Sequence, residues 1–490
     1  MSTVAELEVT YDTLYIGGEW VPPTGSERIT ITSPSTLQQI GSVPDGTEQD
    51  IDVAVTAARR AFDDPSGWSR WSAEQRQETL NKLADAMDAR AEDSALRTSS
   101  QNGMPVAISR AFEGPFPGMV LRYYADLATK QDVEERRPGL LGGTSIVRRT
   151  PIGVVGAIVP WNFPQAITFL KLAPLLAAGC TVVLKPSPET TLDAYTIAEA
   201  AEAAGVPAGV INIVQGGREV GAYLVQHPGI DKVSFTGSTA AGRKIGEVCG
   251  RLLRPVTLEL GGKSAAIVLD DADLVGNMEA LFGSMLINNG QTCWLNSRIL
   301  APKSRYDDVV ETLSALANGV TIGNPLDDGT QIGPLVSQVQ RERVEGYIQK
   351  GKDEGARVAA GGGRPDGLDG YFVQPTIFAD VDRNSAIAQE EIFGPVLSVI
   401  QYDDEDDAIA IANGTEYGLG GTVWTQDQER GLAVARRVQT GSIGINHYVN
   451  DPAAPFGGVK SSGLGRELGP EGLAHYQALQ TVYLDPPAAG

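Results

Sequence analysis

The sequence predicts an α/β protein that contains a doubly wound parallel sheet. Between about residues 151 and 270, short apolar runs alternate with stretches of helical pattern. The runs contain little polar alternation, which is typical of strands covered by helices on both faces. A strand, a helix and a second strand in this order form a parallel βαβ unit. We therefore expect a nucleotide-binding sheet in this part of the chain.

Each predicted strand in this region is a short β-rich run, and each predicted helix lies between two strands. The best-marked helix places Leu192, Tyr195 and Ala198 on one face, and Gly205 and Pro207 end it. The strand candidates are 154–159, 181–185, 210–214, 232–235, 256–260 and 265–269. The helix candidates are 164–177, 190–204, 218–226 and 239–250.

Downstream the alternation is less regular but continues. A helical run at 276–288 precedes Cys293, and a strand candidate at 298–301 follows it. Gly-rich turns lie at 361–363 and 456–458. These features predict a second α/β domain.

Two further segments predict a small appendage. Residues 131–150 are poor in apolar side chains and could leave the first domain and return to it. The tail, 476–484, alternates weakly and predicts an edge strand, whose unpaired backbone groups need a partner. At about 150 residues per domain, 490 residues predict about three units.

The composition excludes several classes of protein. Hydrophobic residues make up 42% of the chain and charged residues 20%, which fits a soluble globular enzyme and not a disordered chain. Lys and Arg total 39 against 61 Asp and Glu, a net charge of −22 that disfavours binding to nucleic acid. The longest apolar run, 172–184, has 13 residues. A membrane span needs about 20, so we expect none.

Localisation and metal binding are judged from the ends of the chain and from its cysteines and histidines. The first six residues lack the positive and apolar regions of a signal peptide. Scattered cysteines imply no disulfide framework, which suits a reducing cytoplasm. The three histidines are dispersed and no zinc-site spacing occurs, so we expect no metal. The three cysteines are Cys180, Cys249 and Cys293.

Two residues are candidates for catalysis, each with an ordinary structural alternative. Cys293 follows a helical run and would need local help to ionise if it is a nucleophile; the alternative is a buried structural cysteine. Glu259 interrupts an apolar strand, where burial would raise its pKa toward that of a general base. Its alternative is a salt bridge, for instance with Lys263.

Three polar segments follow predicted strands. Asn162 lies in a Pro-bounded aromatic turn and offers an amide donor for an oxyanion; the alternative is a packed turn. The small residues of 234–238 open a helix, whose N-terminus favours a pyrophosphate, although the GxGxxG pattern is missing. Lys185 ends a strand and could donate to a ribose; the alternative is an exposed lysine.

The order of these motifs is more specific than any one of them. Together they resemble the NAD(P)-dependent aldehyde dehydrogenase superfamily, in its hydrolytic, non-acylating branch. The likeness runs from 15–20 (YIGGEW) to the tail, and so covers nearly the whole chain. The motifs are 160–164 (PWNFP), 185–187 (KPS), 235–238 (FTGS), 259–263 (ELGGK), 290–293 (GQTC), 391–395 (EIFGP) and 455–463 (PFGGVKSSG).

The resemblance implies a catalytic role for four residues. Cys293 would attack the aldehyde carbon to give a thiohemiacetal, and loss of a hydride to the cofactor would leave a thioester. The side-chain amide of Asn162 and the backbone N–H of Cys293 would stabilise the oxyanion. Glu259 would activate the water that releases the acid. Lys171 matches a family lysine that assists proton movement or tunes Glu259.

The resemblance also implies a binding site for NAD. Glu391 would hold the nicotinamide ribose, with Phe393 beside the nicotinamide. Relatives that prefer NAD carry Glu three residues after the lysine that matches Lys185, but here that position is Pro188 and Glu189 comes one place later. The barrier against NADP is weakened, so NAD is expected and NADP is the alternative. The cofactor residues implied are Trp161, Lys185, Ser187, Gly237, Ser238, Leu260, Glu391 and Phe393.

The substrate pocket implied by motif alignment is apolar. Such a lining suits an aliphatic, aromatic or terpenoid aldehyde, because apolar pockets discriminate by shape. Arg298 could bind a carboxylate, but it falls in a predicted strand and is interpreted as structural. The implied pocket residues are Phe163, Ile167, Leu170, Trp294 and Phe456.

The family pattern also implies the domain division and assembly. The expected cofactor domain comprises 1–130 and 150–259, and the catalytic domain 260–465. Segments 131–149 and 474–486 would join subunits into a homodimer or homotetramer. Two alternatives remain for function: a CoA-acylating aldehyde dehydrogenase, which Glu259 disfavours, and a non-catalytic protein that retains the fold, which the presence of Cys293, Glu259 and Asn162 disfavours.

Overall fold

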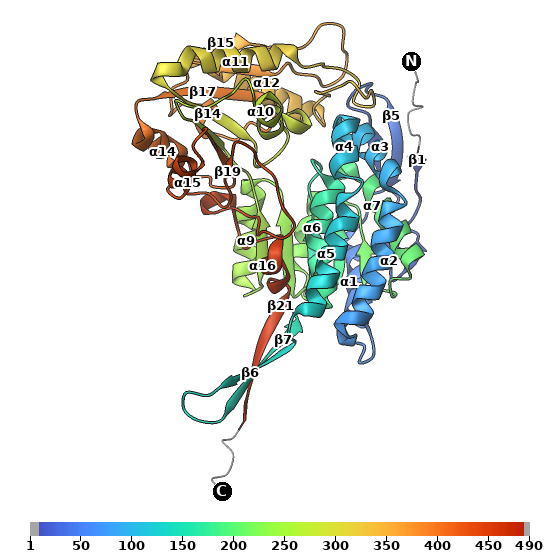
Figure 1. Ribbon diagram of the computed structural model, residues 1–490. Helices are drawn as coiled ribbons and strands as arrows, with labels where there is room; N and C mark the ends of the chain where they lie inside the picture. Colours follow the sequence, from blue (N-terminus) through green and yellow to red (C-terminus); the bar gives the residue numbers. More distant parts are fainter. Residues whose placement is uncertain (1–8, 485–490) are drawn as a thin grey trace.

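Two large sheets, a small three-stranded sheet near the N-terminus and a projecting three-stranded arm make up the described part of the molecule (Figure 1). The computed structural model describes residues 9–484. Residues 1–8 of the expected cofactor domain and 485–486 of the expected tail segment lie outside the described residues. The predicted fold class is confirmed: an α/β protein with a doubly wound parallel sheet, a second α/β sheet and a small β arm.

The first sheet has eight strands. These are β2 (Leu14–Ile16), β3 (Glu19–Val21), β8 (Val154–Ile158), β9 (Thr181–Lys185), β10 (Ile211–Ile213), β11 (Lys232–Thr236), β12 (Val256–Glu259) and β20 (Gly463–Leu464). Their order is β20-β12-β11-β8-β9-β10-β2-β3. The strands from β12 to β10 run parallel, and antiparallel strands close both edges.

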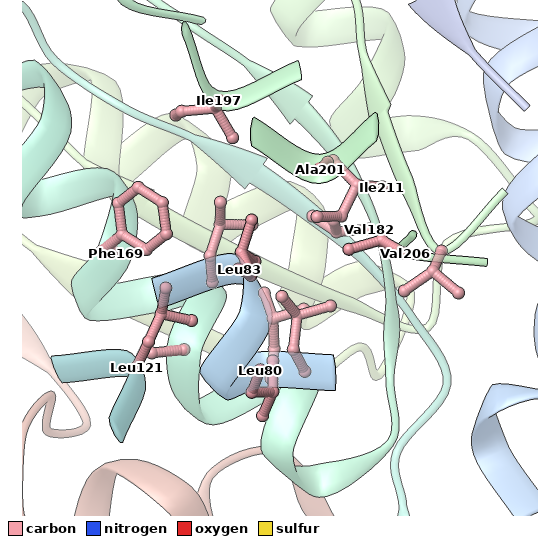
Figure 2. Close-up of a cluster of buried hydrophobic side chains, with 14 of the residues drawn as sticks. Leu80, Leu83, Leu121, Phe169, Val182, Ile197, Ala201, Val206 and Ile211 are labelled. Carbon is pink, nitrogen blue, oxygen red and sulfur yellow. The ribbon is translucent and has the colours of Figure 1, made fainter. Parts of the chain in front are cut away.

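Helices cover both faces of this sheet, which explains why its strands are continuously apolar. Val155 and Ala157 of β8 face one hydrophobic cluster, whereas Val154 and Ile158 face another. Figure 2 shows the first cluster, where Leu80, Leu121 and Phe169 from three helices meet strand side chains. The helices on that face are α2 (Ala73–Asp88), α5 (Phe116–Lys130), α6 (Pro164–Ala178) and α7 (Leu192–Ala204), and those on the other are α1 (Glu48–Asp63), α8 (Arg218–Gln226) and α9 (Thr239–Arg251).

Most predicted elements of this sheet are found within a residue or two. The predicted helix at 190–204 begins at Leu192, because residues from Pro188 to Thr190 form a separate 3-10 turn. Helix α6 ends where Gly179 adopts a φ of 95°, a conformation that suits glycine.

The second sheet has seven strands in the order β15-β16-β17-β14-β13-β18-β19. All adjacent pairs run parallel except β15 with β16. The strands are β13 (Ser264–Val268), β14 (Asn296–Pro302), β15 (Arg357–Ala360), β16 (Thr376–Ala379), β17 (Val396–Tyr402), β18 (Gly421–Trp424) and β19 (Gly444–Ile445). The helices around them are α10 (Met278–Met285), α11 (Tyr306–Gly319), α12 (Gln338–Asp353), α13 (Ala386–Gln389), α14 (Glu405–Asn413) and α15 (Gln428–Ala435).

The predicted helix at 276–288 is too long. Helix α10 ends at Met285, and Asn288 and Asn289 then adopt left-handed φ values of 52° and 59°. Asparagine tolerates this region better than most residues. The Asn289 side chain donates to the carbonyls of Gly103 and Pro334, both at 2.9 Å, so tertiary hydrogen bonds replace those of a further helical turn.

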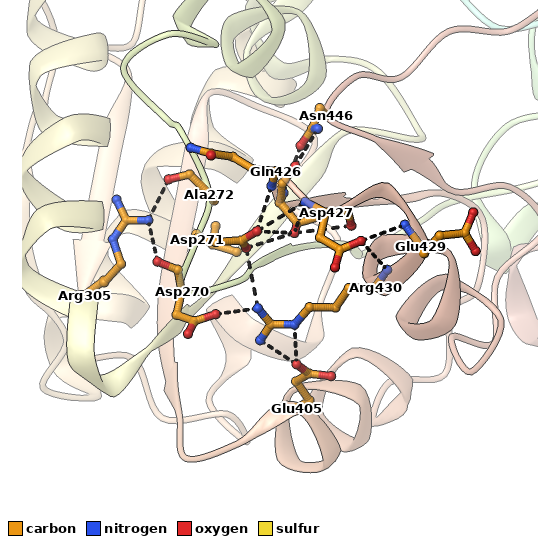
Figure 3. Close-up of polar contacts among 12 residues, drawn as sticks. Asp270, Asp271, Ala272, Arg305, Glu405, Gln426, Asp427, Glu429, Arg430 and Asn446 are labelled. Carbon is orange, nitrogen blue, oxygen red and sulfur yellow. Dashed lines mark hydrogen bonds and ion pairs between the residues drawn. The ribbon is translucent and has the colours of Figure 1, made fainter.

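A network of charged residues joins the end of β13 to α14 and α15 (Figure 3). The Arg430 guanidinium donates to Asp270 at 2.6 Å and to Glu405 at 2.7 Å. Asp271 accepts from the Thr425 hydroxyl at 2.8 Å. Exposed ion pairs each stabilise weakly, so we interpret the network as orienting these elements.

The predicted appendage is an antiparallel arm that projects away from both large sheets (Figure 1). The tail strand is found, and it pairs along its full length with β7. The arm consists of β6 (Glu134–Pro138), β7 (Thr144–Pro151) and β21 (Gln477–Leu484). The remaining elements are β1 (Val9–Thr10), β4 (Arg28–Thr32), β5 (Gln39–Pro44), α3 (Ala91–Asn102), α4 (Val106–Phe112) and α16 (Gly469–Ala474). Within 9–484, no helix is both long and apolar enough to cross a bilayer.

Candidate active site

The strand order of the first sheet reverses at β8. From β8, the chain continues to β9 and β10 on one side, whereas β11 and β12 lie on the other. At such a switch point a crevice opens beyond the carboxyl ends of the strands. There β8 leads into Trp161 and Asn162, and β11 leads into Gly237 and Ser238. Two of the sequence motifs therefore meet at this crevice.

The Gly-Gly pair after β12 brings three further motifs together. A Cβ on Gly261 would lie 2.5 Å from the Glu391 carboxylate, and a Cβ on Gly262 would lie 2.5 Å from the carbonyl of Cys293. Only glycine permits both approaches. The backbone N–H of Gly262 also donates to Glu391 at 3.0 Å. Glu259 ends the same strand, so the ELGGK, GQTC and EIFGP motifs share one site.

Cys293 lines a cavity of about 220 Å³ together with Glu259 and Asn162. Glu259 and Asn162 are each 3% exposed, so the polar end of the cavity is buried. The exposed side chains of Phe112 and Val449 also line the cavity and mark its mouth. All five residues predicted for the substrate pocket line it as well: Phe163, Ile167, Leu170, Trp294 and Phe456.

Asn162 is held by hydrogen bonds from both sides. Its side-chain Nδ2 donates to the carbonyl of Gln291 at 3.0 Å. Its own carbonyl accepts from the side chains of Asn102, at 3.2 Å, and Asn288, at 2.9 Å. An asparagine amide carries two N–H groups, so one N–H is left to face the cavity. An amide N–H without another partner is the kind of group that can donate to an oxyanion.

Glu259 does not form the salt bridge with Lys263 that the sequence left open. Among the described residues, neither Glu259 oxygen nor Lys263 Nζ has a hydrogen-bond partner. Burial, and then the Glu467 carboxylate, raise the pKa of Glu259 well above its usual value. Burial lowers the pKa of Lys263 to about 7. The Glu259 carboxylate instead packs beside Gly457, where a Cβ would lie 2.6 Å from Oε1.

The surroundings of the half-buried Cys293 thiol favour its protonated form. Burial raises its pKa, and the Glu259 and Glu391 carboxylates raise it further. The backbone N–H groups of Cys293 and Trp294 oppose the shift. A nucleophilic role therefore needs a base that takes the thiol proton during attack, and Glu259 lines the same cavity.

Lys185 is not the exposed lysine that the sequence allowed. It is 6% exposed, and its Nζ donates to the carbonyls of Pro186 at 2.8 Å and Gly216 at 2.6 Å. Burial lowers its pKa to about 8. Beyond it, the Ser187 hydroxyl donates to the Glu189 carboxylate. Glu189 also acts on the pKa of Lys185 and raises it, so this negative charge lies near the end of β9.

The other predicted cofactor residues lie around the same crevice. The Ser238 hydroxyl caps α9 by accepting from the N–H of Ala241 at 3.3 Å. Leu260 lies against α9, since a Cβ on Gly242 would come within 2.4 Å of it. The rings of Trp161 and Phe393 meet edge to face with centroids 5.4 Å apart.

Arg298 is structural, as interpreted from the sequence. Its buried guanidinium donates to the carbonyls of Lys263, Ile411 and Ala412 at 2.7–2.8 Å. It is not among the residues that line the cavity. It therefore offers no site for a substrate carboxylate.

Comparison with known proteins shows which family the chain belongs to. The family model described as "Aldehyde dehydrogenase family" matches residues 20–482. The chain belongs to the aldehyde dehydrogenase family. It is therefore an oxidoreductase, and the aldehyde dehydrogenase activity expected from the motifs is supported at the level of aldehyde oxidation in general.

Relatives of this aldehyde dehydrogenase match it along its whole length. Geranial dehydrogenase of Castellaniella defragrans is 52% identical over 98% of this chain and 100% of its own. A Mycobacterium tuberculosis aldehyde dehydrogenase, crystallised with NAD+, is 46% identical with a TM-score of 0.96, covering 98% of this chain and 99% of that one. Aldehyde dehydrogenase C of Pseudomonas syringae, a mutant crystallised with NAD+ and octanal, is 37% identical with a TM-score of 0.93, covering 98% of both.

Sequence analysis did not identify Glu467 as a residue of the aldehyde dehydrogenase site. Lys171, which we expected near Glu259, forms a buried ion pair with Glu467 and donates to the Thr236 hydroxyl at 2.6 Å. Glu467 lines the cavity and is one of the groups that raise the pKa of Glu259. Nothing in the local sequence marks Glu467 as buried, since it follows Arg466 as an ordinary charged pair would.

We expect Glu467→Gln to move the acidic limb of the pH–rate profile to lower pH. The substitution removes a negative charge that raises the pKa of Glu259, and it frees the Lys171 cation, which lowers that pKa. Loss of one partner of a buried pair also costs about 3–5 kcal/mol of stability. Steady-state rates across pH, with thermal unfolding, measure both effects, and Glu471→Gln, an acid outside the cavity, is the control. An unmoved acidic limb would contradict the electrostatic link.

Proposed function

We propose that this protein oxidises an apolar aldehyde to its carboxylic acid with NAD+, with Cys293 as nucleophile and Glu259 as general base. The observation that carries the proposal is the shared cavity. A thiol, a carboxylate without partners among residues 9–484 and an amide donor line the buried end of one apolar pocket. Such convergence of reactive groups in a cleft is the usual mark of a catalytic centre.

The first half of the reaction forms the thioester. Glu259 takes the proton of the Cys293 thiol as Sγ attacks the carbonyl carbon, because burial keeps the thiol protonated at rest. The resulting thiohemiacetal oxyanion accepts from the free N–H of Asn162 and from the backbone N–H of Cys293. A bound NAD+ would supply the hydride acceptor for this carbon, at which the C–O double bond would form again.

The second half releases the acid. Glu259 first releases to solvent the proton that it took from the thiol. It then takes a proton from water, whose oxygen attacks the thioester carbon, and the Cys293 thiolate leaves and regains that proton. The raised pKa of Glu259 matches this task, since it gives the carboxylate enough basicity to accept a proton from water. The products are the carboxylic acid, NADH and one proton.

The crevice residues fit a dinucleotide. The N-terminus of α9, with Gly237 before it, favours a pyrophosphate, and a Cβ on Gly237 would lie 2.6 Å from the Phe235 ring. Glu391 would hold the ribose of the nicotinamide, with Phe393 beside the ring, and Lys185 and Ser187 would serve the other ribose. Trp161 and Leu260 would form apolar walls. NAD+ in related crystal structures supports this assignment.

We expect Pro188→Glu to lower the use of NADP+ selectively. Pro188 stands at a turn beyond Lys185, and a carboxylate there would face the 2′-phosphate of NADP+ in addition to Glu189. Opposed like charges are expected to reduce kcat/KM for NADP+ by about tenfold or more, with little change for NAD+. Pro188→Gln is the matched uncharged control. An equal loss with both cofactors would show that position 188 does not face the 2′ position.

We also propose that the arm assembles subunits, with the cofactor domain formed by 1–130 and 150–259 and the catalytic domain by 260–465. The arm exposes apolar side chains in a place with no core of its own. Leu140 and Leu141 at the tip of the hairpin are fully exposed, and Leu479 and Tyr483 of β21 are largely so. Exposed apolar surface of this kind is typical of an interface. A homodimer or homotetramer is the expected state.

The proposed function is tested by an absorbance assay for NADH with purified protein. The panel comprises aliphatic, aromatic, terpenoid and carboxylated aldehydes, each with and without CoA. We expect NADH from apolar aldehydes without CoA, and weaker activity with carboxylated ones, because no Lys or Arg among residues 9–484 lines the cavity to pair with the substrate carboxylate. Turnover that requires CoA would instead indicate the acylating reaction.

A further inference from the structure

One wall of the substrate cavity is formed by a helix that contributes almost no side chain. Helix α10 lines the cavity through Ala280 and Gly283. The other elements contribute large groups to the lining, including Phe112, Phe116, Phe163, Trp294 and Phe456. The cavity is therefore wide on the α10 side because α10 places no large side chain there.

Neither the backbone nor the packing requires glycine at 283. Gly283 lies inside α10 and has no positive φ, so any residue can adopt its conformation. A Cβ placed there meets no heavy atom within 4 Å. In contrast, a Cβ on Gly242 of α9 would collide with Leu260 at 2.4 Å. Glycine inside a helix costs stability relative to alanine, so its presence at 283 needs another reason.

The position of Gly283 along the cavity indicates why a residue without a side chain is found there. The reactive groups of Asn162 and Glu259 lie at the buried end, and Val449, 65% exposed, lies at the mouth. Gly283 is half-buried, between these limits. A side chain at 283 would therefore occupy the outer part of the cavity, where the hydrocarbon chain of an aldehyde lies once its carbonyl has reached Cys293.

We propose that Gly283 is a specificity-determining residue, which by lacking a side chain admits aldehydes whose apolar chain is long or bulky enough to reach the outer part of the cavity. This inference rests on the proposed function and adds the substrate class. The cavity of about 220 Å³ runs from its buried end, lined by Asn162 and Glu259, to its mouth at Val449. A short aldehyde fills only the buried end, whereas a branched ten-carbon aldehyde also needs the space beside Gly283.

The test compares Gly283→Leu with the unchanged protein on propanal and geranial. We expect kcat/KM for geranial to fall by about tenfold or more, because steric exclusion of a few methylene equivalents has that size. For propanal we expect a change of less than about threefold. Gly283→Ala should give an intermediate loss with geranial. Gly346→Leu, at an exposed glycine in α12, is the matched control and should change neither value.

Two results would overturn the inference. A parallel loss with both aldehydes would mean that the substitution disturbs catalysis or folding, and thermal unfolding of Gly283→Leu separates these causes. Unchanged values with both would mean that the outer cavity does not hold the substrate chain. Geraniol has no aldehyde group, so the rise in melting temperature that it causes measures binding in the pocket without turnover. This rise should be smaller in Gly283→Leu. If the unchanged protein binds geraniol but oxidises no aldehyde, the proposed function fails and the pocket assignment stands.

Discussion

Replacing Cys293 with alanine is expected to abolish aldehyde oxidation and leave NAD+ binding intact. The reaction as proposed passes through two covalent states on Sγ, so its loss should lower kcat by about 10⁴-fold or more. Alanine removes only the side-chain sulfur, and the backbone N–H that faces the oxyanion remains. NADH formation and calorimetric titration with NAD+ measure the two properties separately.

The chain offers a matched control for this substitution. Cys249 lies buried in α9, where a hydrophobic cluster surrounds it, and it does not line the cavity. Cys249→Ala should therefore retain activity and lose only packing stability. Sustained turnover by Cys293→Ala would contradict the nucleophilic role and, with it, the proposed mechanism.

Replacing Glu259 with glutamine is expected to trap the acyl-enzyme. Without a base for water, deacylation should slow by about 10²–10⁴-fold. Because Glu259 is also the proposed acceptor of the thiol proton, rapid mixing should show a slowed burst of NADH, and the rate of this burst measures the part of Glu259 in the first step. Mass spectrometry should then show the acyl group on Cys293. An unchanged steady-state rate would contradict both roles, and Glu247→Gln, on the exposed side of α9, is the control.

The same substitution has a defined effect on stability. Because the pKa of Glu259 is raised in the folded state, the folded protein holds a proton that the unfolded chain has lost. The free energy of unfolding therefore falls as the pH rises from the unfolded pKa through the raised one. Glu259→Gln cannot ionise and should show a smaller fall over this range. Urea unfolding at several pH values measures the difference.

The strands and helices of the first sheet were predictable because each carries its own local signal. Continuous apolar runs such as 181–185 reflect burial on both faces, and glycine at 179 and 205 ends two helices in a conformation that few other residues adopt. The end of α10 was not predictable in this way. The left-handed pair Asn288 and Asn289 is held by partners at Gly103 and Pro334, far away in the sequence.

The residues of the candidate site also differ in whether a local sequence signal could reveal them. Cys293, Glu259 and Asn162 stand in sequence motifs. The order of these motifs along the chain gives the family resemblance that implies the chemistry. Glu467 and Gly283 carry no such signal. A glutamate after an arginine and a glycine in a helix are both ordinary in sequence, and only their surroundings in the fold suggest the roles proposed for them.

The sequence by itself determined the fold class and the order of the motifs, since apolar periodicity and residue type are local properties, and the resemblance carried by that order implied the chemistry proposed here. Only the tertiary structure decided which charges face one another and how wide the pocket is. It placed Glu467 on Lys171 and near Glu259, left Lys263 without the partner that sequence proximity suggested, and left open space beside Gly283. Electrostatic shifts and cavity shape depend on distances across the fold, and those distances join residues hundreds of positions apart.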